Sequence, residues 1–384
     1  MVVSTRQSSL APDRHDAIVI GGGLVGAAIA CGLAEQGLDT LLLDEGDVAH
    51  RASRGNFGLV WVQSKGLGAP HYQRWSRHSA AAWPAFAAAL AARTGLDTAL
   101  EQPGGLHICL SEDEFAARAA RMERMRAEAG NLGFEYRMLS RAEVAERLPG
   151  IGPAVVGASW TPYDGHAGAL TLLHALHAAF RDLGGTYRPN AAVAGLDAAP
   201  HDFRVSAGGA TMRAPRLVLA AGLGNAVLAP MVGLAAPVRP ERGQILVTER
   251  VRRVLSMPTV NVRQTAEGSL LIGESKEDAG FDSTTQIPSV MRDMARRAVM
   301  GMPWIAALNI VRAWSALRVM SADGLPIYDQ STRFPGAFTA NCHSGVTLAA
   351  AHTRMLAPMI AAGALAPELL PFSAERFGHV RTAA

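Results

Sequence analysis

The chain has 384 residues, which is enough for two domains with a large buried core. Hydrophobic residues make up 49% of it and charged residues 18%, a balance that excludes an intrinsically disordered chain. The formal net charge is only +3. The arginines that supply most of the positive charge are scattered along the chain, so we expect no nucleic-acid partner.

Cysteine spacing and apolar runs bear on the compartment. Cys31, Cys109 and Cys342 show neither metal-ligand nor Cys-x-x-Cys spacing, which predicts buried free thiols in a reducing compartment and no metal site. No signal-peptide-like apolar stretch precedes Asp16. The apolar run 17–34 contains five glycines and leads into a strand, so a buried turn and helix fit better than a membrane span. We expect a cytoplasmic protein.

The first fifty residues predict a strand, a glycine turn, a helix and a second strand. Residues 16–20 form a short β-branched run, and residues 24–36 have the apolar spacing of a helix. Gly37 suits the position just past a helix C-terminus. Residues 38–44 are almost continuously apolar, as in a parallel sheet covered on both faces.

The rest of the chain alternates predicted helices and strands without an internal repeat or a low-complexity linker. Helices are predicted at 76–93, 112–129, 142–148, 170–183 and 346–362, and strands at 105–110, 191–196, 203–207, 215–222, 238–248, 269–273 and 336–340. The runs 238–248 and 269–273 resemble strands of an antiparallel sheet. We therefore expect two domains that interleave, with the chain crossing between them several times.

The glycine turn predicts a dinucleotide site. Gly21 permits the tight turn, Gly23 lets backbone approach a pyrophosphate, and Gly26 lets the helix pack on the strand. The helix N-terminus then faces the phosphates, and Asp44 ends the second strand where a ribose hydroxyl needs an acceptor. A purely structural glycine turn would leave Asp44 unexplained. An acidic ribose contact argues against NADP, but the turn alone does not separate FAD from NAD.

Two later segments are consistent with FAD. The chain from Arg51 to Gly58 is small, polar and basic, which suits contact with a pyrophosphate and an isoalloxazine, although the same composition also fits a solvated loop. The segment 343–345 precedes a predicted helix, so its backbone N–H groups could face the N1/C2 carbonyl edge of a flavin. Ser344 could instead simply cap that helix.

Taken together, the ordered motifs resemble the D-amino-acid oxidase/glycine oxidase-like family of FAD-dependent oxidoreductases, over nearly the whole chain. The motifs that carry the resemblance lie at 19–26, 53–58, 219–222, 242–244, 271–282, 318–327 and 342–348. The last two segments look closest to a branch with the flavin subunits of opine dehydrogenase, D-hydroxyproline dehydrogenase and hydrogen cyanide synthase, and with iminodiacetate-type oxidases. This resemblance implies an α/β fold: a Rossmann-like FAD domain with a mostly parallel sheet, interleaved with a smaller substrate domain on an antiparallel sheet. We assign 14–95, 150–225 and 320–384 to the former, and 96–149 and 226–319 to the latter.

The resemblance also implies the chemistry, which is oxidation of a carboxylate-bearing amine by hydride transfer to flavin N5. Arg318 matches the carboxylate-binding arginine of the glycine oxidase pattern, although it could be an ordinary ion-paired arginine. Lys276 falls in a segment that lines the active site of relatives, but it could pair with a neighbouring carboxylate at the surface. Tyr163 and His343 are candidates for hydrogen bonds to substrate or flavin. The predicted flavin contacts are Gly21, Gly23, Leu24, Val25, Gly26, Asp44, Glu45, Arg51, Ser53, Arg54, Asn56, Gly58, Ala221, Gly222, Gly243, His343, Ser344, Gly345, Val346 and Thr347.

One departure from relatives concerns flavin attachment. Sarcosine oxidases carry a flavin-linking cysteine just after the arginine-containing strand, where this chain reads Arg318-Val319-Met320-Ser321, so we predict non-covalent FAD. We expect oxygen to accept the electrons, with a catalytic flavin subunit that passes them to partner subunits as the alternative, between which the chain itself does not decide. The sequence also leaves open a flavin-binding subunit without catalysis and an NAD-dependent dehydrogenase.

Overall fold

A computed structural model describes residues 13–46, 52–284 and 286–378. Its first elements are those expected from the sequence: strand β2 (Ala17–Ile20), helix α1 (Leu24–Glu35) and strand β3 (Thr40–Leu43). Gly37 follows the helix in the left-handed region, with φ of 80°. There a residue with a Cβ atom would be strained.

These strands belong to a six-stranded sheet in the order β18-β19-β13-β2-β3-β9. All neighbours pair in parallel except β18, which is antiparallel to β19 at one edge. Its other members are β9 (Thr186–Arg188), β13 (Leu217–Leu219), β18 (Ile327–Gln330) and β19 (Ala337–Asn341). The sheet is therefore assembled from four separate stretches of sequence.

The parallel sheet has a different partner on each face because successive side chains of a strand point to opposite sides. Val19 and Leu42 pack against the helical side, while Ile18 and Leu41 pack against a small sheet that is antiparallel except for the parallel pair β1 and β12. That small sheet has the order β1-β12-β11-β10, with bounds β1 (Asp13–Arg14), β10 (Val193–Ala199), β11 (Asp202–Ala207) and β12 (Ala210–Ala214). Burial on both faces explains why these strands read as continuous apolar runs.

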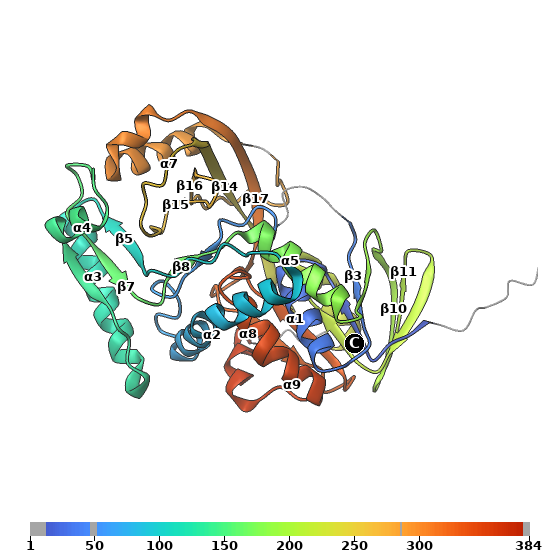
Figure 1. Cartoon of the computed structure of the whole chain (residues 1–384). Helices are drawn as coiled ribbons and strands as arrows, with labels where there is room; N and C mark the ends of the chain where they lie inside the picture. Colours follow the sequence, from blue (N-terminus) through green and yellow to red (C-terminus); the bar gives the residue numbers. More distant parts are fainter. Residues whose placement is uncertain (1–12, 47–51, 285, 379–384) are drawn as a thin grey trace, which may run out of the picture.

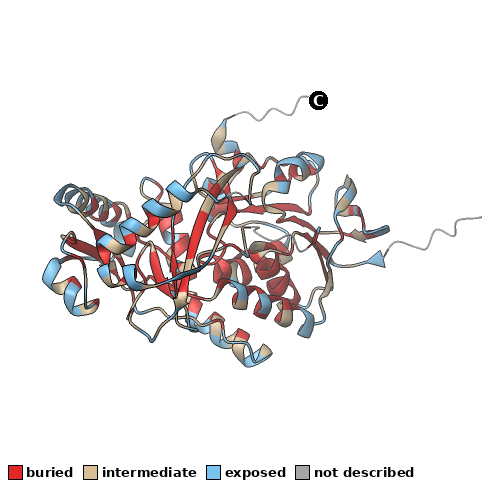
Figure 2. Cartoon of the chain, turned by 90° about the horizontal axis from the view of Figure 1, so that it is seen from above, coloured by how far each residue is buried: buried red, intermediate tan, exposed pale blue. Residues whose placement is uncertain are grey.

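The helical side groups α1 with α2, α5, α8 and α9 in one layer (Figure 1). Their bounds are α2 (Pro70–Thr94), α5 (Ala169–Asp182), α8 (Ala349–Ala351) and α9 (Ala357–Ala362), with a π-helical segment η5 (His352–Leu356) between the last two. Figure 2 shows most of the strands and the inner sides of the helices buried, and the outer sides of the helices exposed. The largest core cluster lies between this helical layer and the sheet.

A second part of the molecule is built on antiparallel sheets. One has the order β15-β16-β14-β17, and the other has the order β5-β7-β6. The bounds are β14 (Val238–Arg250), β15 (Val262–Gln264), β16 (Ser269–Ile272), β17 (Ile310–Ser321), β5 (Gly105–Cys109), β6 (Arg137–Ser140) and β7 (Gly157–Thr161). The helices here are α3 (Glu112–Glu128), α4 (Arg141–Arg147) and α7 (Pro288–Gly301). One core cluster joins both sheets with α4 and α7.

Short elements complete the description. They are β4 (Leu59–Val60), which pairs with β8 (Gly165–His166), α6 (Asn225–Leu228), and the 3-10 turns η1 (Gly130–Leu132), η2 (Gly222–Gly224), η3 (Ala229–Val232), η4 (Pro303–Ala307), η6 (Pro367–Phe372) and η7 (Ala374–Phe377). The expected mixture of a mostly parallel sheet and antiparallel sheets is confirmed. The exact domain bounds stay a prediction.

The C-terminal helix differs from the sequence prediction of a single helix over 346–362. Residues 345–348 form a turn, α8 begins at Ala349, and a π-helical segment interrupts the helix. Ser344 is not its cap, because its hydroxyl contacts Lys65 and Tyr72 instead. The reading of Ser344 as a plain N-cap is therefore wrong.

Candidate active site

The glycine turn between β2 and α1 has no room for side chains. Gly21 has φ of 111°, and a Cβ atom there would lie 2.4 Å from the Ala220 carbonyl oxygen. At Gly26 a Cβ atom would lie 1.8 Å from the Gly21 oxygen. The N-cap, Gly23, offers α1 no side-chain acceptor, and the first turn of the helix carries no acidic residue. This helix end is thus shaped to receive an anionic group at its N–H donors.

Asp44 lies at the carboxyl end of β3 and holds the turn from the side. Its Oδ2 accepts a hydrogen bond from the Gly22 amide at 2.7 Å, and its Oδ1 accepts one from the Gly46 amide at 3.0 Å. Each carboxylate oxygen has a second acceptor position, so both can also take a hydroxyl donor such as a ribose diol. Glu45, the next residue, is exposed.

The predicted flavin-contacting segment packs back onto the glycine turn. Ser53 Oγ accepts a hydrogen bond from the Leu24 amide at 2.9 Å, and Asn56 Oδ1 accepts one from the Gly58 amide at 2.8 Å. Arg54 is exposed. Arg51 lies outside the described residues. The segment is therefore a structured wall next to the helix N-terminus.

Three other predicted contacts lie around the same site. Val25 is partly buried against the main core cluster, in the first turn of α1. The Ala221 amide donates to Asn225 Oδ1 at 3.0 Å, and Gly222 follows with φ of 58° at the end of β13. The cradle of glycines, the helix N-terminus with a glycine as its N-cap, and the acidic residue fit the adenosine diphosphate half of FAD. When bound, FAD supplies the two-electron acceptor for oxidation of the substrate.

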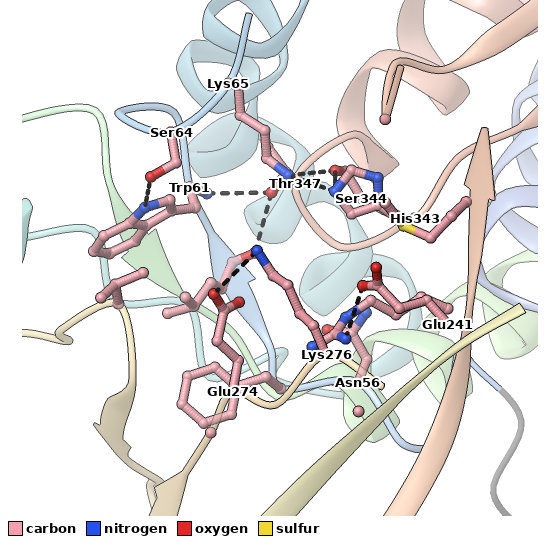
Figure 3. A pocket seen from close by; sticks show the side chains of 18 of the residues that line it. Asn56, Trp61, Ser64, Lys65, Glu241, Glu274, Lys276, His343, Ser344 and Thr347 are labelled. Atoms are coloured by element: carbon pink, nitrogen blue, oxygen red, sulfur yellow. Dashed lines mark hydrogen bonds and ion pairs between the residues drawn. The ribbon is translucent and has the colours of Figure 1, made fainter. Parts of the chain in front are cut away.

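A cavity of about 860 Å³ adjoins the segment 52–67 and opens between β14, β17, α3 and the turn at 343–347 (Figure 3). The predicted residues on its lining are Asn56, Gly243, Lys276, Arg318, His343, Ser344, Val346 and Thr347. Gly345 packs behind them against Leu24 and Val25. The cavity thus brings together segments that are far apart in the sequence.

Lys65 is a cavity residue that the sequence reasoning missed. Its ammonium donates to Ser344 Oγ and lies 3.3 Å from His343 Nε2, while the Tyr72 hydroxyl lies 3.0 Å from the same serine oxygen. Burial lowers the pKa of Lys65 to about 8, with Arg318 adding to the effect and nearby acidic groups opposing it. The available signal was that Lys65 is one of only two lysines in an arginine-rich chain.

His343 is neutral in this environment. Burial holds its pKa well below the usual range, and the charges of Lys65, Arg318 and Lys276 lower that pKa further. An unprotonated ring can accept the hydrogen bond that Lys65 donates. Because the charges of all three cations affect the same ring, positive charge converges on this part of the cavity. Figure 3 shows Lys65, Lys276 and His343 around it.

Arg318 projects from β17 and is fixed by two contacts. Its Nη1 donates to the Ser275 carbonyl oxygen at 2.7 Å and lies 3.2 Å from Glu241 Oε1. Its guanidinium lies over Gly243 on the adjacent strand, where an added Cβ atom would be 2.7 Å from Nη2. It is both an ion-paired arginine and a cavity residue. Its contacts with Ser275 and Glu241 both use Nη1, and the described part of the chain provides no acceptor for the other N–H groups of the guanidinium.

Of the predicted substrate residues Lys276 and Tyr163, only Lys276 lies on the cavity lining. Lys276 lines the cavity, and its side chain is exposed. Its Nζ lies 3.7 Å from Glu274 Oε1, so its ion pair is with Glu274 and not with the expected Glu277 or Asp278. Tyr163 is not on the cavity lining. Its hydroxyl accepts from Arg77 Nη2 and from the Glu135 amide, both at 3.1 Å, so it has a structural place away from the candidate site.

Other sequence expectations concern metals, thiols and membranes. The described residues contain no cluster of three potential metal ligands. The three cysteines are free thiols, with Cys31 and Cys109 buried and Cys342 partly buried. Over the described ranges no single helix is long and apolar enough to cross a membrane, although the bent pair 349–362 and 367–377 passes that test on length and composition.

The chain belongs to the DAO family of FAD-dependent oxidoreductases, whose family model matches residues 16–359. It is 47% identical over 364 residues to an opine oxidase subunit of Rhizobium meliloti, covering 94% of this chain and 97% of that one. A hydrogen cyanide synthase subunit of Pseudomonas aeruginosa is 27% identical, with 94% and 96% covered. The crystal structure of glycine oxidase from Geobacillus kaustophilus superposes with a TM-score of 0.86 at 26% identity, covering 97% of this chain and 100% of that one.

The protein is accordingly an FAD-binding enzyme that acts on C–N bonds of amino or imino acids. The predicted family, its cofactor and its enzyme class are confirmed. The individual site residues and the non-covalent attachment of FAD stay predictions.

Proposed function

We propose that the protein oxidises the C–N bond of an opine-type imino acid, as the catalytic flavin subunit of a multi-subunit oxidase. The observation that carries the substrate class is the cationic cavity beside the flavin-binding turn, in which Arg318, Lys276 and Lys65 converge on the neutral His343. A carboxylate on the substrate needs a fixed cation, and the fork of an arginine suits it best.

Each cavity residue has a defined task in this proposal. The free edge of Arg318 binds the substrate carboxylate, while Glu241 and Ser275 hold the guanidinium in place. Fixing the carboxylate orients the neighbouring C–H bond, which lowers the entropic part of the barrier. Lys65 supplies a second positive charge on the His343–Ser344 side. Both cations favour an anionic substrate over a neutral amine.

The subunit assignment is supported by relatives at 47% and 27% identity whose names describe them as subunits. A self-contained oxidase that returns electrons to oxygen is the second candidate, because the glycine oxidase relative shares the fold over the whole chain. We see no cysteine cluster for an iron–sulfur relay in this sequence, so any such relay comes from a partner.

Anaerobic bleaching of the flavin absorbance tests the substrate class. The panel contains glycine, sarcosine, D-amino acids, D-hydroxyproline, iminodiacetate and opines. We expect opines and iminodiacetate to bleach the flavin fastest, and bleaching by none of the panel contradicts the proposal. Hydrogen peroxide release from the purified chain separates the acceptors: stoichiometric release with every turnover supports the self-contained oxidase and removes the need for partner subunits.

A further inference from the structure

The cavity has a second cationic wall, formed by α3 and independent of the residues assigned above. Arg118 and Arg121 lie three positions apart on this helix and both line the cavity. Side chains at this spacing share one face of a helix. The charge of Arg121 contributes to lowering the pKa of Arg118, whose main cause is burial, so the two guanidiniums lie close together.

Neither arginine has an acidic partner. No carboxylate lies within 4 Å of either guanidinium among the residues that the structure describes. Arg118 is 5% exposed and is anchored through neutral groups, with Nε donating to Ser159 Oγ at 2.7 Å and Nη2 donating to Gln63 Oε1 at 2.7 Å. Its Nη1 has no acceptor within the described ranges. A buried charge that keeps an open donor facing a cavity is suited to an anion from outside.

Arg121 is held even less tightly. Among the residues that the structure describes, its one hydrogen bond runs from Nη2 to the Ser64 carbonyl oxygen at 3.3 Å, and its Nε is buried without an acceptor. The Nη1 protons and the second Nη2 proton have no acceptor among the described residues, so this edge of the planar guanidinium is left for a bidentate partner. By contrast, Arg297 on the same side of the cavity is fully paired with Glu114 through two bonds of 3.0 and 2.9 Å.

The remaining groups around this wall do not cancel its charge. Burial lowers the pKa of His107 to about 3, and Arg118 adds to the effect, so the imidazole is neutral. Asp164 interacts electrostatically with Arg118, and burial raises the pKa of this carboxyl to about 7, against hydrogen bonds from Val62 and Gln63. At neutral pH it is therefore only partly ionised and offsets only part of the charge of the two arginines. Glu114 forms an ion pair with Arg297, which neutralises its charge. The wall therefore presents net positive charge to the cavity interior.

We propose that Arg121, supported by Arg118, forms the subsite that binds the second carboxylate of the opine-type substrate. This inference rests on the proposed function, because Arg318 binds the first carboxylate there. Arg318, Arg118 and Arg121 line one cavity of about 860 Å³, which also contains the predicted flavin contacts His343 and Thr347. The flavin ring and a substrate that reaches both walls therefore share this volume. The second carboxylate replaces the acceptor that Arg121 lacks within the protein.

The test compares matched pairs of compounds on the flavin-loaded protein. Each N-alkylglycine is paired with the compound that carries one more carboxylate at the end of the same N-alkyl group. The first pair is sarcosine and iminodiacetate, and the series extends to N-alkyl groups of four carbons. We expect the best diacid to have a kcat/KM at least 10-fold above its monoacid counterpart. Arg121→Gln is expected to lower kcat/KM for that diacid 10- to 100-fold and to leave the monoacid within about twofold, the range typical of a lost charge-assisted hydrogen bond. Arg126→Gln is the matched control, because Arg126 lies on the same helix but pairs with Glu123 at the surface.

Ligand binding without turnover keeps this inference separate from the proposed function. Thiodiacetate and (methylthio)acetate differ by one carboxylate and lack the oxidisable C–N bond. We expect a larger ligand-induced rise in melting temperature with thiodiacetate, lost in Arg121→Gln and kept in Arg126→Gln. Equal effects of Arg121→Gln on both members of each pair, or none on either, overturn the second subsite. Selective thiodiacetate binding without flavin bleaching by any amine instead overturns the proposed function and leaves the subsite standing.

Discussion

Replacing Lys65 by methionine should make the protein more stable and less active. Burial lowers the pKa of Lys65 from its ordinary 10.5 to about 8. One pKa unit corresponds to about 1.4 kcal/mol, so holding this amine charged costs the folded protein about 3 kcal/mol at pH 7. Methionine removes that cost and loses the hydrogen bonds to Ser344 and His343, worth about 1 kcal/mol each. The difference is a net gain of about 1 kcal/mol, which is an upper value because cavity water screens part of the charge.

The sign of the pH dependence gives the prediction its sharpest test. The folded-state pKa lies below the unfolded one, so the wild-type protein releases its proton on folding between pH 8 and pH 10.5 and becomes more stable as pH rises through that window. Methionine at this position does not titrate. The advantage of Lys65→Met should therefore shrink by roughly 1 kcal/mol between pH 7 and pH 9.

The assays are thermal melting at the two pH values and kcat/KM for a carboxylate substrate across the same range. We expect a melting temperature about 1 °C higher at pH 7, with kcat/KM at least 10-fold lower. We expect kcat/KM of the wild-type protein to fall near pH 8, where Lys65 loses its proton, and we expect this fall to be absent in the variant. Both proteins are measured with the same substrate, so that ionisation of the substrate cancels. Lys276→Met is the control, because that side chain is exposed and its removal should change stability by less than about 0.5 kcal/mol. A lower melting temperature for Lys65→Met at pH 7, or a pH-independent difference, refutes the reasoning.

Three further predictions concern the flavin and the first carboxylate. Gly26→Ala should abolish flavin retention in the purified protein, because its Cβ would lie 1.8 Å from the Gly21 oxygen, whereas Gly301→Ala meets no atom within 4 Å and should keep its yellow colour. Asp44→Asn should weaken FAD affinity about 10-fold in a fluorescence titration, since a charged acceptor becomes a neutral one. Gly243→Ala should raise KM for the carboxylate substrate at least 10-fold with the Arg318 charge retained, because the new methyl displaces that guanidinium; an unchanged KM contradicts the role of Arg318.

Local sequence signals predicted the flavin-binding part of the fold well. The glycine turn, α1 and β3 lie where composition and periodicity placed them, because burial on both faces of a parallel sheet leaves a continuous apolar run. Helix α3 was predicted within one residue, and its Ser111 cap accepts a hydrogen bond from the Glu114 amide. These elements are specified by neighbours in the sequence.

The elements that sequence reasoning passed over carried weaker or conflicting signals. β17 mixes arginines and a tryptophan into an alternating strand, because one of its faces lines a polar cavity. α7 begins at Pro288 with no side-chain cap, although a proline at this position is itself a start signal. The continuous helix predicted for 346–362 failed because its first residues form the turn that brings Ser344 to Lys65.

The candidate site was predictable only in part, for a physical reason. Arg318 and His343 were named because they occupy motif positions, whereas Lys65 and Arg121 come from an unremarkable loop and a charged surface-type helix. Tyr163 has the right chemistry but its hydroxyl is engaged by Arg77 and the Glu135 backbone. Which charged side chains face one cavity is decided by the packing of the α3 and β17 regions, and no local pattern records it.

The order of strands in the parallel sheet has a consequence for how the protein is made. β2 is among the first elements to leave the ribosome. Its neighbour in the sheet, β13, pairs along its other edge with β19, which lies near the C-terminal end of the chain. The flavin-binding sheet therefore stays incomplete until residues 337–341 are synthesised. Until then the apolar faces of β2, α1 and β3 are not fully buried. We expect the nascent chain to depend on chaperones for most of its synthesis, and C-terminal truncations ahead of β19 to aggregate rather than yield a smaller flavoprotein.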